Sequence, residues 1–205
     1  MVKQDRAVRT RAALVRAGAE EFAASGFAGA SVARIAVRAG LTLGAMYFHF
    51  QNKEDLAREI VRNQPNLVVT PHASQGLQHA VDITLTWACR LLDDPVLLAG
   101  ARLVMDQEHF IDPAENSHRQ WADVLARDLH VADRRRELRA GVDVDAMARL
   151  LVNACTGAQM HARMESGHQD LPQRVAETWR CLLPALAVPS VIRRLEFGEE
   201  RGRCA

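Results

Sequence analysis

The sequence predicts an all-α protein, formed either by one large domain or by a small N-terminal helical domain joined to a larger helical body. Its 205 residues are 48% hydrophobic and 25% charged, and Ala and Leu, which favour helices, are abundant. No run of alternating β-branched and polar residues is long enough to indicate a strand. Apolar residues instead recur at helical spacing between Gly, Pro and capping residues. A chain of this length can bury a substantial core.

A basic first helix is predicted over residues 5–24. Leu14 and Phe22 fall near helical spacing, and Gly26 is expected to stop the helix. Residues 1–64 hold ten Lys and Arg against six Asp and Glu, whereas the rest of the chain holds sixteen against nineteen. A basic N-terminal unit on a slightly acidic remainder indicates a polyanion binder joined to a second unit.

A second and a third helix are predicted in close succession. Ser31 is the expected N-cap of the second helix, and Gly40 stands where a left-handed residue ends it. The third helix then begins with Thr42 as its N-cap. Because Met46 and Phe50 share one face of this helix, we expect both to pack inward.

A fourth helix is predicted to begin at Asn52, where Asp55 takes the place that Glu or Gln has in a capping box. Residues 63–76 contain two prolines and a glycine and form the clearest break in the chain. Beyond the break the apolar pattern predicts helices over 75–93, 95–110, 115–131, 143–166 and 170–185, and a short one after Pro189.

Two short helices joined by a tight turn that contains Gly, the second led by Thr and small residues, are typical of a helix-turn-helix. Gly44 and Ala45 lack bulk, so the backbone can come close to DNA. Tyr47 and His49 have polar tips suited to phosphate oxygens, and Lys53 adds a compact positive charge. The alternative is a packed helical hairpin whose aromatic residues belong to the core. The basic first helix and the Gly turn favour DNA binding.

The segment "GLTLGAMYFHFQNKEDL", residues 40–56, closely resembles the recognition-helix signature of the tetracycline-repressor (TetR) family of transcriptional regulators. Residues 3–27, 100–107, 118–125 and 182–202 further resemble the γ-butyrolactone receptor branch of that family. The resemblance implies a homodimer that binds double-stranded operator DNA, each subunit with a small head of three helices at the N-terminus and a larger helical body. The DNA-contacting positions it implies are Ser31, Arg34, Thr42, Leu43, Gly44, Ala45, Tyr47, His49 and Lys53.

Leu43 departs from the branch, which usually has Lys at this position. An ammonium can reach a phosphate or a guanine edge, whereas Leu offers only apolar contact, for instance to a thymine methyl group. Losing one phosphate contact should reduce the salt dependence of binding by about one unit of slope. Leu43 therefore leaves the operator sequence and the affinity open, but not the class of protein.

The body is expected to hold a small, mostly apolar effector. The resemblance implies that Trp121 forms a wall of the site, because a flat indole suits a lactone ring. Trp87 and Met105 are further expected walls, with plain core packing as the alternative. Two polar positions in the helix 143–166 and one at the end of the fourth helix complete the predicted effector site, namely Thr156, Gln159 and Gln64.

The last two long helices are expected to pair with those of a second copy in a four-helix bundle. The apolar stripe predicted for this interface consists of Trp179, Leu182, Leu183 and Leu186, with internal core as the alternative. We predict a helix-turn-helix domain over residues 1–52 and a ligand-binding and dimerisation domain over residues 53–205.

Other classes of protein find little support in the sequence. There is no phosphate-binding glycine loop, nucleophile elbow or HExxH motif, and the four Cys have no metal-ligand spacing. The charged N-terminus cannot lead a signal peptide, and no apolar run is long enough to span a membrane. We therefore expect a cytoplasmic regulator, not an enzyme, with no cofactor, no metal and no membrane partner.

The functional prediction is a repressor released from its operator by a γ-butyrolactone, furan or butenolide, and controlling secondary-metabolite genes. One alternative is a pseudo-receptor of the same fold that responds to an antibiotic or a biosynthetic intermediate. Another is an architectural DNA binder without an effector, which a test for any small molecule that changes DNA affinity would distinguish.

Overall fold

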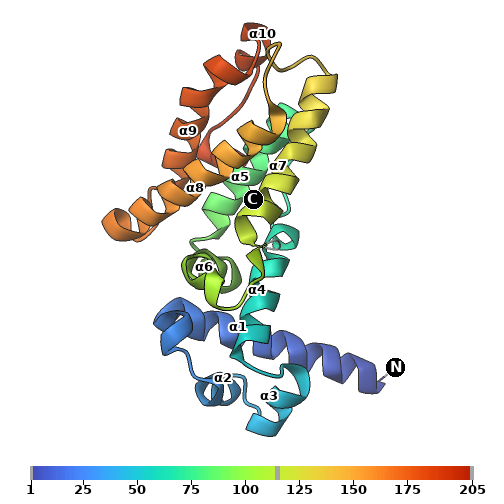
Figure 1. Cartoon of the computed structure of the whole chain (residues 1–205), viewed down its shortest axis with the longest axis vertical. Helices are drawn as coiled ribbons and strands as arrows, with labels where there is room; N and C mark the ends of the chain where they lie inside the picture. Colours follow the sequence, from blue (N-terminus) through green and yellow to red (C-terminus); the bar gives the residue numbers. More distant parts are fainter. Residues whose placement is uncertain (1, 114–115, 204–205) are drawn as a thin grey trace. The chain divides into compact units, whose positions relative to one another are not determined.

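The computed structural model describes residues 2–113 and 116–203, and its regular elements there are all helices (Figure 1). The all-α prediction is therefore confirmed, and only an isolated bridge between Leu138 and Ala187 has β geometry in the described residues. The helices are α1 (Val2–Gly29), α2 (Val32–Arg38), α3 (Leu43–His49), α4 (Lys53–Leu67), α5 (Leu77–Arg90), α6 (Pro95–Leu103), the 3₁₀ helix η1 (Val104–His109), α7 (Ser117–Arg134), α8 (Val144–Ser166), α9 (Leu171–Leu186), α10 (Pro189–Ile192) and the 3₁₀ helix η3 (Glu199–Arg201).

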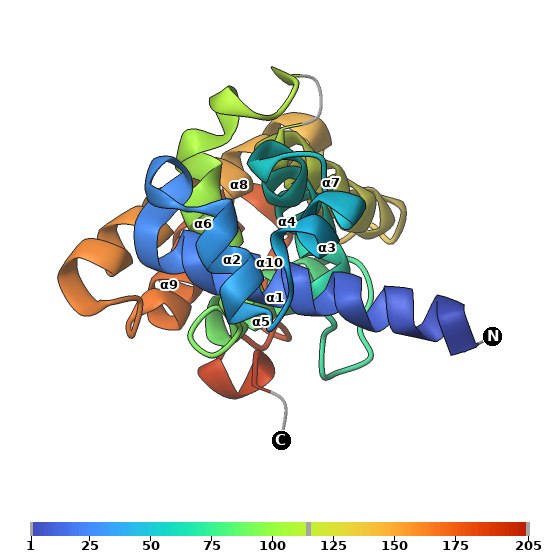
Figure 2. The same cartoon turned by 90° about the horizontal axis from the view of Figure 1, so that it is seen from below.

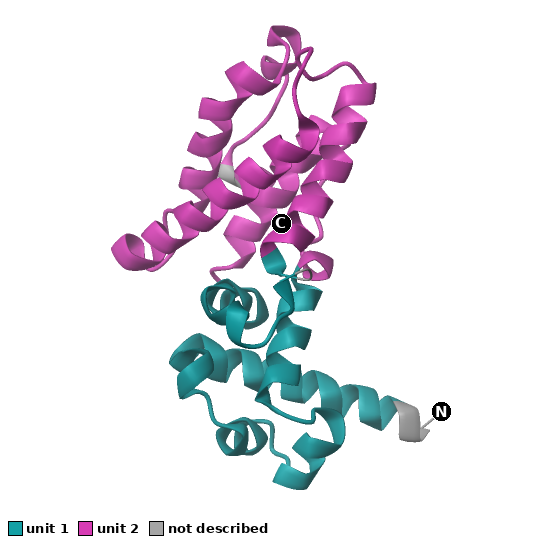
Figure 3. Ribbon diagram, in the orientation of Figure 1, with its two compact units in different colours: residues 1–64, 94–117 teal, residues 65–93, 118–205 magenta. Residues whose placement is uncertain are grey.

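The chain forms two compact units, and each is built from two separate stretches of sequence (Figure 3). Unit 1 contains residues 1–64 and 94–117, and unit 2 contains residues 65–93 and 118–205. The boundary thus falls inside α4, after Gln64, and α6 and η1 pack with the N-terminal helices. The predicted division between a DNA-binding domain and a ligand-binding domain at residues 52 and 53 stays a prediction. The two compact units show which residues pack together and not which residues share a function.

Unit 1 places α2 and α3 on one side of the long helix α1. Figure 1 shows both helices below α1, and Figure 2 views the molecule from that side. One hydrophobic core joins the helices of this unit. It fully buries Phe22 of α1, Ile35 of α2 and Met46 of α3, and apolar residues of α4 and α6 also belong to it. Phe50 is buried there as well, so the predicted inward face of α3 is confirmed.

The predicted caps of these short helices are largely present. The Thr42 hydroxyl accepts a hydrogen bond from the Ala45 N–H at 3.2 Å, and Gly40 has a φ of +67°. Ser31 does occupy the N-cap position of α2, but its side chain makes no capping hydrogen bond. Asn52 caps α4 as predicted, by accepting from the Asp55 N–H at 2.7 Å.

Several element boundaries differ from the prediction. Helix α1 is assigned to Gly29, but Gly26, with a non-helical φ of 71° and ψ of 177°, interrupts it at a kink, so the predicted break at Gly26 is present and a short helical piece follows it. The predicted helix 95–110 is divided into α6 and η1. Pro65 lies within α4 instead of ending it. The predicted helix 115–131 begins at a residue outside the described ones, and the structure has α7 from Ser117 to Arg134.

Unit 2 is organised around α5, which is buried along most of its length. The Trp179 indole of α9 donates a hydrogen bond at 2.8 Å to the Thr84 hydroxyl of α5. Trp179, Leu183 and Leu186 are buried within the single subunit. The prediction that these three residues form the dimer interface is therefore wrong, because they already face the core that α9 shares with its own chain.

The segment that follows α10, residues 193–203, is here called the C-terminal strap, and it is fastened to α5. The Gln78 amide exchanges two hydrogen bonds with the Glu196 backbone, at 2.8 and 3.0 Å. Arg201 donates twice to the carboxylate of fully buried Asp82, at 3.1 and 2.7 Å. A Cβ on Gly202 would lie 2.5 Å from the Leu85 carbonyl oxygen, so only glycine fits this approach.

Every helix in the described residues is too short or too polar to span a bilayer.

Candidate functional site

The exposed face of α3 consists of four residues at helical spacing. Leu43 and Tyr47 are one turn apart, as are Gly44 and Phe48, and all four are exposed. Tyr47 is 50% and Phe48 81% exposed, although both are large aromatic residues. The opposite side of the helix is anchored by buried Met46. The helix therefore presents an outer surface that its own unit covers only in part.

Three further predicted DNA residues surround this surface. Thr42 is exposed, and its hydroxyl oxygen accepts the cap bond from half-buried Ala45. The His49 ring stands edge-on to the Phe48 ring, with 5.1 Å between the ring centroids. Thr42, Ala45 and His49 thus adjoin the exposed face, as the helix-turn-helix prediction requires.

Ser31 and Arg34, at the start of α2, share one buried partner. The Glu21 carboxylate accepts from Arg34 Nε at 2.6 Å and from the Ser31 N–H at 3.4 Å. Burial raises the pKa of Glu21, but the hydrogen bonds from Arg34 and Ser31 and the positive charges of Arg34 and Arg38 together outweigh it, so the net pKa lies below its ordinary value. Arg34 also donates to the Gly29 carbonyl at 2.5 Å. The guanidinium is therefore held in a fixed orientation while more than half of its side chain stays exposed.

Lys53, at the start of α4, is partly engaged with the protein. Its ammonium donates to the Phe27 carbonyl at 2.8 Å and lies 4.5 Å from the centroid of the Phe27 ring. A weaker bond of 3.5 Å reaches the Ala30 carbonyl. Because these carbonyls follow the kink at Gly26, the ammonium stabilises the end of α1 in addition to any role on DNA.

Unit 2 contains a cavity of about 50 Å³ between α5, α7 and α8. It brings together three of the six predicted effector residues, Trp87, Trp121 and Thr156. Burial raises the pKa of the Cys155 thiol, which also lines the cavity, to about 12, so this sulfur is an apolar wall and not a nucleophile. The complete lining is Thr84, Trp87, Trp121, Leu125, Val152, Cys155 and Thr156.

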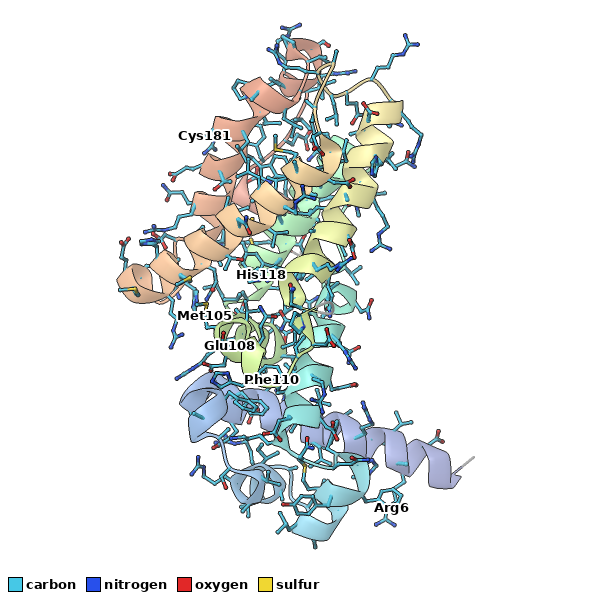
Figure 4. All side chains as sticks on the ribbon, viewed as in Figure 1. Arg6, Met105, Glu108, Phe110, His118 and Cys181 are labelled. Atoms are coloured by element: carbon cyan, nitrogen blue, oxygen red, sulfur yellow. The ribbon has the colours of Figure 1, made fainter. Side chains whose placement is uncertain are left out.

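The other three predicted effector residues are not part of this lining. The Gln64 amide is buried in unit 1 and donates to the Val96 carbonyl of α6 at 2.8 Å. Met105, labelled in Figure 4, is the second residue of η1 in unit 1 and is 49% exposed. Gln159 is buried, and its Nε2 lies 3.0 Å from Nε2 of His168. For both glutamines a protein group satisfies the polar side chain. For Gln159 this removes the need for a partner that suggested a ligand, whereas Gln64 was predicted from its place at the end of the fourth helix and from the family resemblance.

Sequence reasoning missed four members of the cavity. Leu125, Val152 and Cys155 carry no signal that separates a cavity wall from ordinary core. Thr84 could have been found, because a hydroxyl in the middle of an apolar helix needs a partner, just as the Thr156 hydroxyl does. The exposed position of Phe48 on α3 was also missed, because an aromatic residue in a short helix is usually assigned to the core.

Two descriptions of known families match the chain. Residues 14–60 match "Bacterial regulatory proteins, tetR family", and residues 74–189 match "Tetracyclin repressor-like, C-terminal domain". The first match contains all of α2, α3 and the turn between them, and the second contains every residue that lines the cavity.

Individual relatives match over nearly the whole chain. The A-factor receptor protein of Streptomyces griseus is 35% identical over 196 residues, which cover 96% of this chain and 70% of that protein. Full-length native TylP, a TetR regulator from Streptomyces fradiae, is 37% identical with a TM-score of 0.86, over 96% of this chain and 95% of that one. A γ-butyrolactone receptor described as ArpA-like is 29% identical with a TM-score of 0.74, over 92% and 94% of the two chains.

Proposed function

Since the chain belongs to the TetR family of bacterial regulatory proteins, we propose that it is a repressor released from its operator by a γ-butyrolactone-type signalling molecule. The chain is a transcriptional regulator and not an enzyme, and its relatives include the A-factor receptor. In this proposal it binds a pseudo-palindromic operator as a homodimer, in the cytoplasm, and controls genes of secondary metabolism.

The observation that carries the proposal is the apolar cavity of unit 2. Two indoles, from Trp87 and Trp121, and the hydroxyls of Thr84 and Thr156 line the same space. This is the composition of a small-molecule site, in which aromatic walls provide contact area and a few polar groups orient the ligand. The exposed face of α3 lies in the other unit, so the two proposed binding functions have separate residues.

The chemistry of the lining favours a compact and mostly apolar effector. The side chains that line the cavity carry no charge, and Thr84 Oγ1 already bonds to Trp179 and to backbone carbonyls of its own helix. The Thr156 hydroxyl is thus the group we assign to a ligand carbonyl or hydroxyl. At about 50 Å³ the cavity is smaller than the roughly 300 Å³ of a typical ligand site, so binding must move its walls.

The homodimer is proposed from an apolar surface of α8 that is exposed in the single subunit. Leu150, Met160 and Met164 of α8 are exposed in the single subunit, and Met160 and Met164 are one turn apart. An apolar face of this kind is typical of helices that pack in a bundle with a second copy. In this proposal it replaces Trp179, Leu183 and Leu186 of α9, which face the core, whereas the fourth predicted residue, Leu182, is half-buried.

The test is fluorescence anisotropy of the purified protein on labelled DNA from upstream of its own gene. The titration is made with and without synthetic γ-butyrolactones of different chain length, and repeated on a scrambled duplex. The expected result is tight binding to the upstream DNA that a lactone reverses.

Two different results would contradict operator binding and the effector assignment separately. Absence of binding to the upstream DNA and to genomic fragments at low salt would contradict operator binding. Tight binding that no lactone disturbs would contradict the γ-butyrolactone assignment, and would transfer the effector to another class, such as an antibiotic or a biosynthetic intermediate.

A further inference from the structure

Exposed apolar side chains gather around the helix-turn-helix. Ten large hydrophobic side chains are exposed in the part of the chain that the structure describes, and four of them lie between residues 37 and 48. These four are Val37, Leu43, Tyr47 and Phe48. Single exposed apolar residues are ordinary on a protein surface, but a local group of them marks a contact site.

The exposed face of α3 also lacks formal charge. The helix Leu43–His49 contains no Lys, Arg, Asp or Glu, and its outer residues are Leu43, Gly44, Tyr47 and Phe48. The nearby guanidinium of Arg34 is directed to Glu21, and the ammonium of Lys53 to the Phe27 carbonyl. Charge-based contacts can therefore come only from residues beside α3, and α3 itself offers apolar surface.

Base edges in the major groove present one large apolar feature, the C5-methyl group of thymine. Leu and Phe side chains cannot donate to or accept from a base edge, but they can cover this methyl group. Leu43 precedes Gly44 and Phe48 follows it by one turn, so the two apolar side chains stand near opposite borders of the exposed face, with Tyr47 and the small Gly44 between them. An exposed phenyl ring also loses unfavourable hydration when it covers a methyl group.

We infer that Leu43 and Phe48 read thymine methyl groups in each operator half-site, so that this regulator selects sequence through apolar contacts. The inference rests on the proposed operator binding and adds the chemistry of base selection. The face includes Tyr47 and adjoins Thr42, which the family resemblance assigns to DNA, and residues 1–64, which carry the face, hold ten Lys and Arg against six Asp and Glu. Operator DNA is therefore the occupant to which the inference commits.

The test replaces each thymine of a mapped half-site by deoxyuridine, which removes the methyl group and leaves every hydrogen-bonding group in place. The half-site is first defined by selection from random duplexes. At one or two positions the wild-type protein should lose about three- to fivefold in affinity, the factor that corresponds to about one buried methyl-sized group. Phe48→Ala and Leu43→Ala should each bind thymine and deoxyuridine duplexes alike at the position that the residue covers.

Val69→Ala is the matched control, because Val69 is an exposed apolar residue of unit 2, and it should keep the full methyl dependence. Circular dichroism and size-exclusion chromatography accompany each variant. Operator binding without any methyl dependence would overturn the inference and leave the proposed function intact, whereas absence of DNA binding would overturn both. A changed oligomeric mass for Phe48→Ala or Leu43→Ala, with unchanged DNA binding, would assign the face to a protein contact and overturn the inference.

Discussion

The side chain of Gln64 packs directly against Gly100 and occupies the space that a Cβ on residue 100 would need. A Cβ on residue 100 would lie 1.5 Å from Nε2 of Gln64. The same Nε2 donates to the Val96 carbonyl at 2.8 Å and lies 3.4 Å from the Leu97 carbonyl. The pair therefore joins α4 to α6 within unit 1 and requires glycine at position 100.

Gly100→Ala should destabilise the protein, although alanine favours helices. Displacing the buried Gln64 amide from its carbonyl costs about 1–3 kcal/mol, against a gain of about 1 kcal/mol in helix propensity. Thermal unfolding should show a lower midpoint than wild type. Gly44→Ala is the control, because its Cβ would meet nothing closer than 3.9 Å, and its midpoint should not fall. A midpoint for Gly100→Ala at or above that of wild type would contradict the fit.

Trp121→Ala should abolish release by the effector while DNA affinity stays within about twofold of wild type. Truncating an aromatic residue at the centre of a site typically costs at least about 2 kcal/mol, or roughly 30-fold in effector affinity. Trp121→Phe keeps a flat ring and should retain most of the response. The measurement is the lactone concentration that half-reverses operator binding. Full release of the Ala variant would show that the effector binds elsewhere.

Tyr47→Phe should weaken binding to all DNA sequences alike. If the exposed hydroxyl of Tyr47 contacts a phosphate, its removal loses one hydrogen bond, about 1 kcal/mol or about fivefold in affinity. The phenyl ring remains, so the folded structure should not change. The comparison is between the operator and a scrambled duplex, and a loss confined to the operator would instead assign the hydroxyl to a base edge.

His168→Asn should flatten the dependence of stability on pH. Burial, together with the nearby Arg163, lowers the pKa of His168 below its ordinary value, so the unfolded chain binds a proton that the folded protein resists. Stability should therefore fall as the pH drops below about 6.5, the ordinary value for histidine. Asn tolerates the φ of 73° at this position but does not titrate.

The measurement for His168 is the unfolding midpoint between pH 5 and 7.5. His72→Asn, which changes an exposed histidine, is the control and should keep the wild-type slope. Equal slopes for wild type and His168→Asn would show that other groups set the acid dependence.

Arg201→Met should be strongly destabilising, because it leaves the fully buried Asp82 carboxylate without its charged partner. Breaking one side of a buried ion pair costs about 3–5 kcal/mol. The double variant with Asp82→Asn should recover much of this loss, since the amide keeps hydrogen bonds with Ser74 and Gln78. Chemical denaturation of the wild type, Arg201→Met, Asp82→Asn and the double variant gives the coupling energy between the two residues. Additive effects of the two substitutions would show that Asp82 and Arg201 do not stabilise the protein through each other.

The helices and most of their caps could be predicted because their signals are local. Thr42 and Asn52 cap the helices that follow them, and Asp143 accepts from the Ala146 N–H at 2.9 Å at the start of α8. Gly167, with a φ of 62°, ends α8 where it was predicted to end. Such signals depend on the backbone geometry of four or five consecutive residues, which the sequence displays directly.

The misplaced predictions for Gln64 and for the apolar face of α9 depend on partners that are distant in sequence. Gln64 finds carbonyls on α6, and Trp179 finds the Thr84 hydroxyl 95 residues away. Periodicity shows that a face of α9 is apolar, but it does not show which neighbour covers that face. Trp87, Trp121 and Thr156 do line one cavity, but only Trp121 was indicated by the family resemblance, and their role in effector binding stays a prediction.

The C-terminal strap also constrains the order in which the protein can fold during synthesis. Asp82 and Arg201 are 119 residues apart, so α5 leaves the ribosome long before its buried carboxylate can meet the guanidinium. Until then the carboxylate must stay hydrated, and α5 cannot take its final buried position without the cost of an unpaired charge. Unit 1 has no such dependence on the strap and needs residues only up to 117. We therefore expect the DNA-binding part to form on the nascent chain and the effector-binding part to be completed only after Arg201 has emerged.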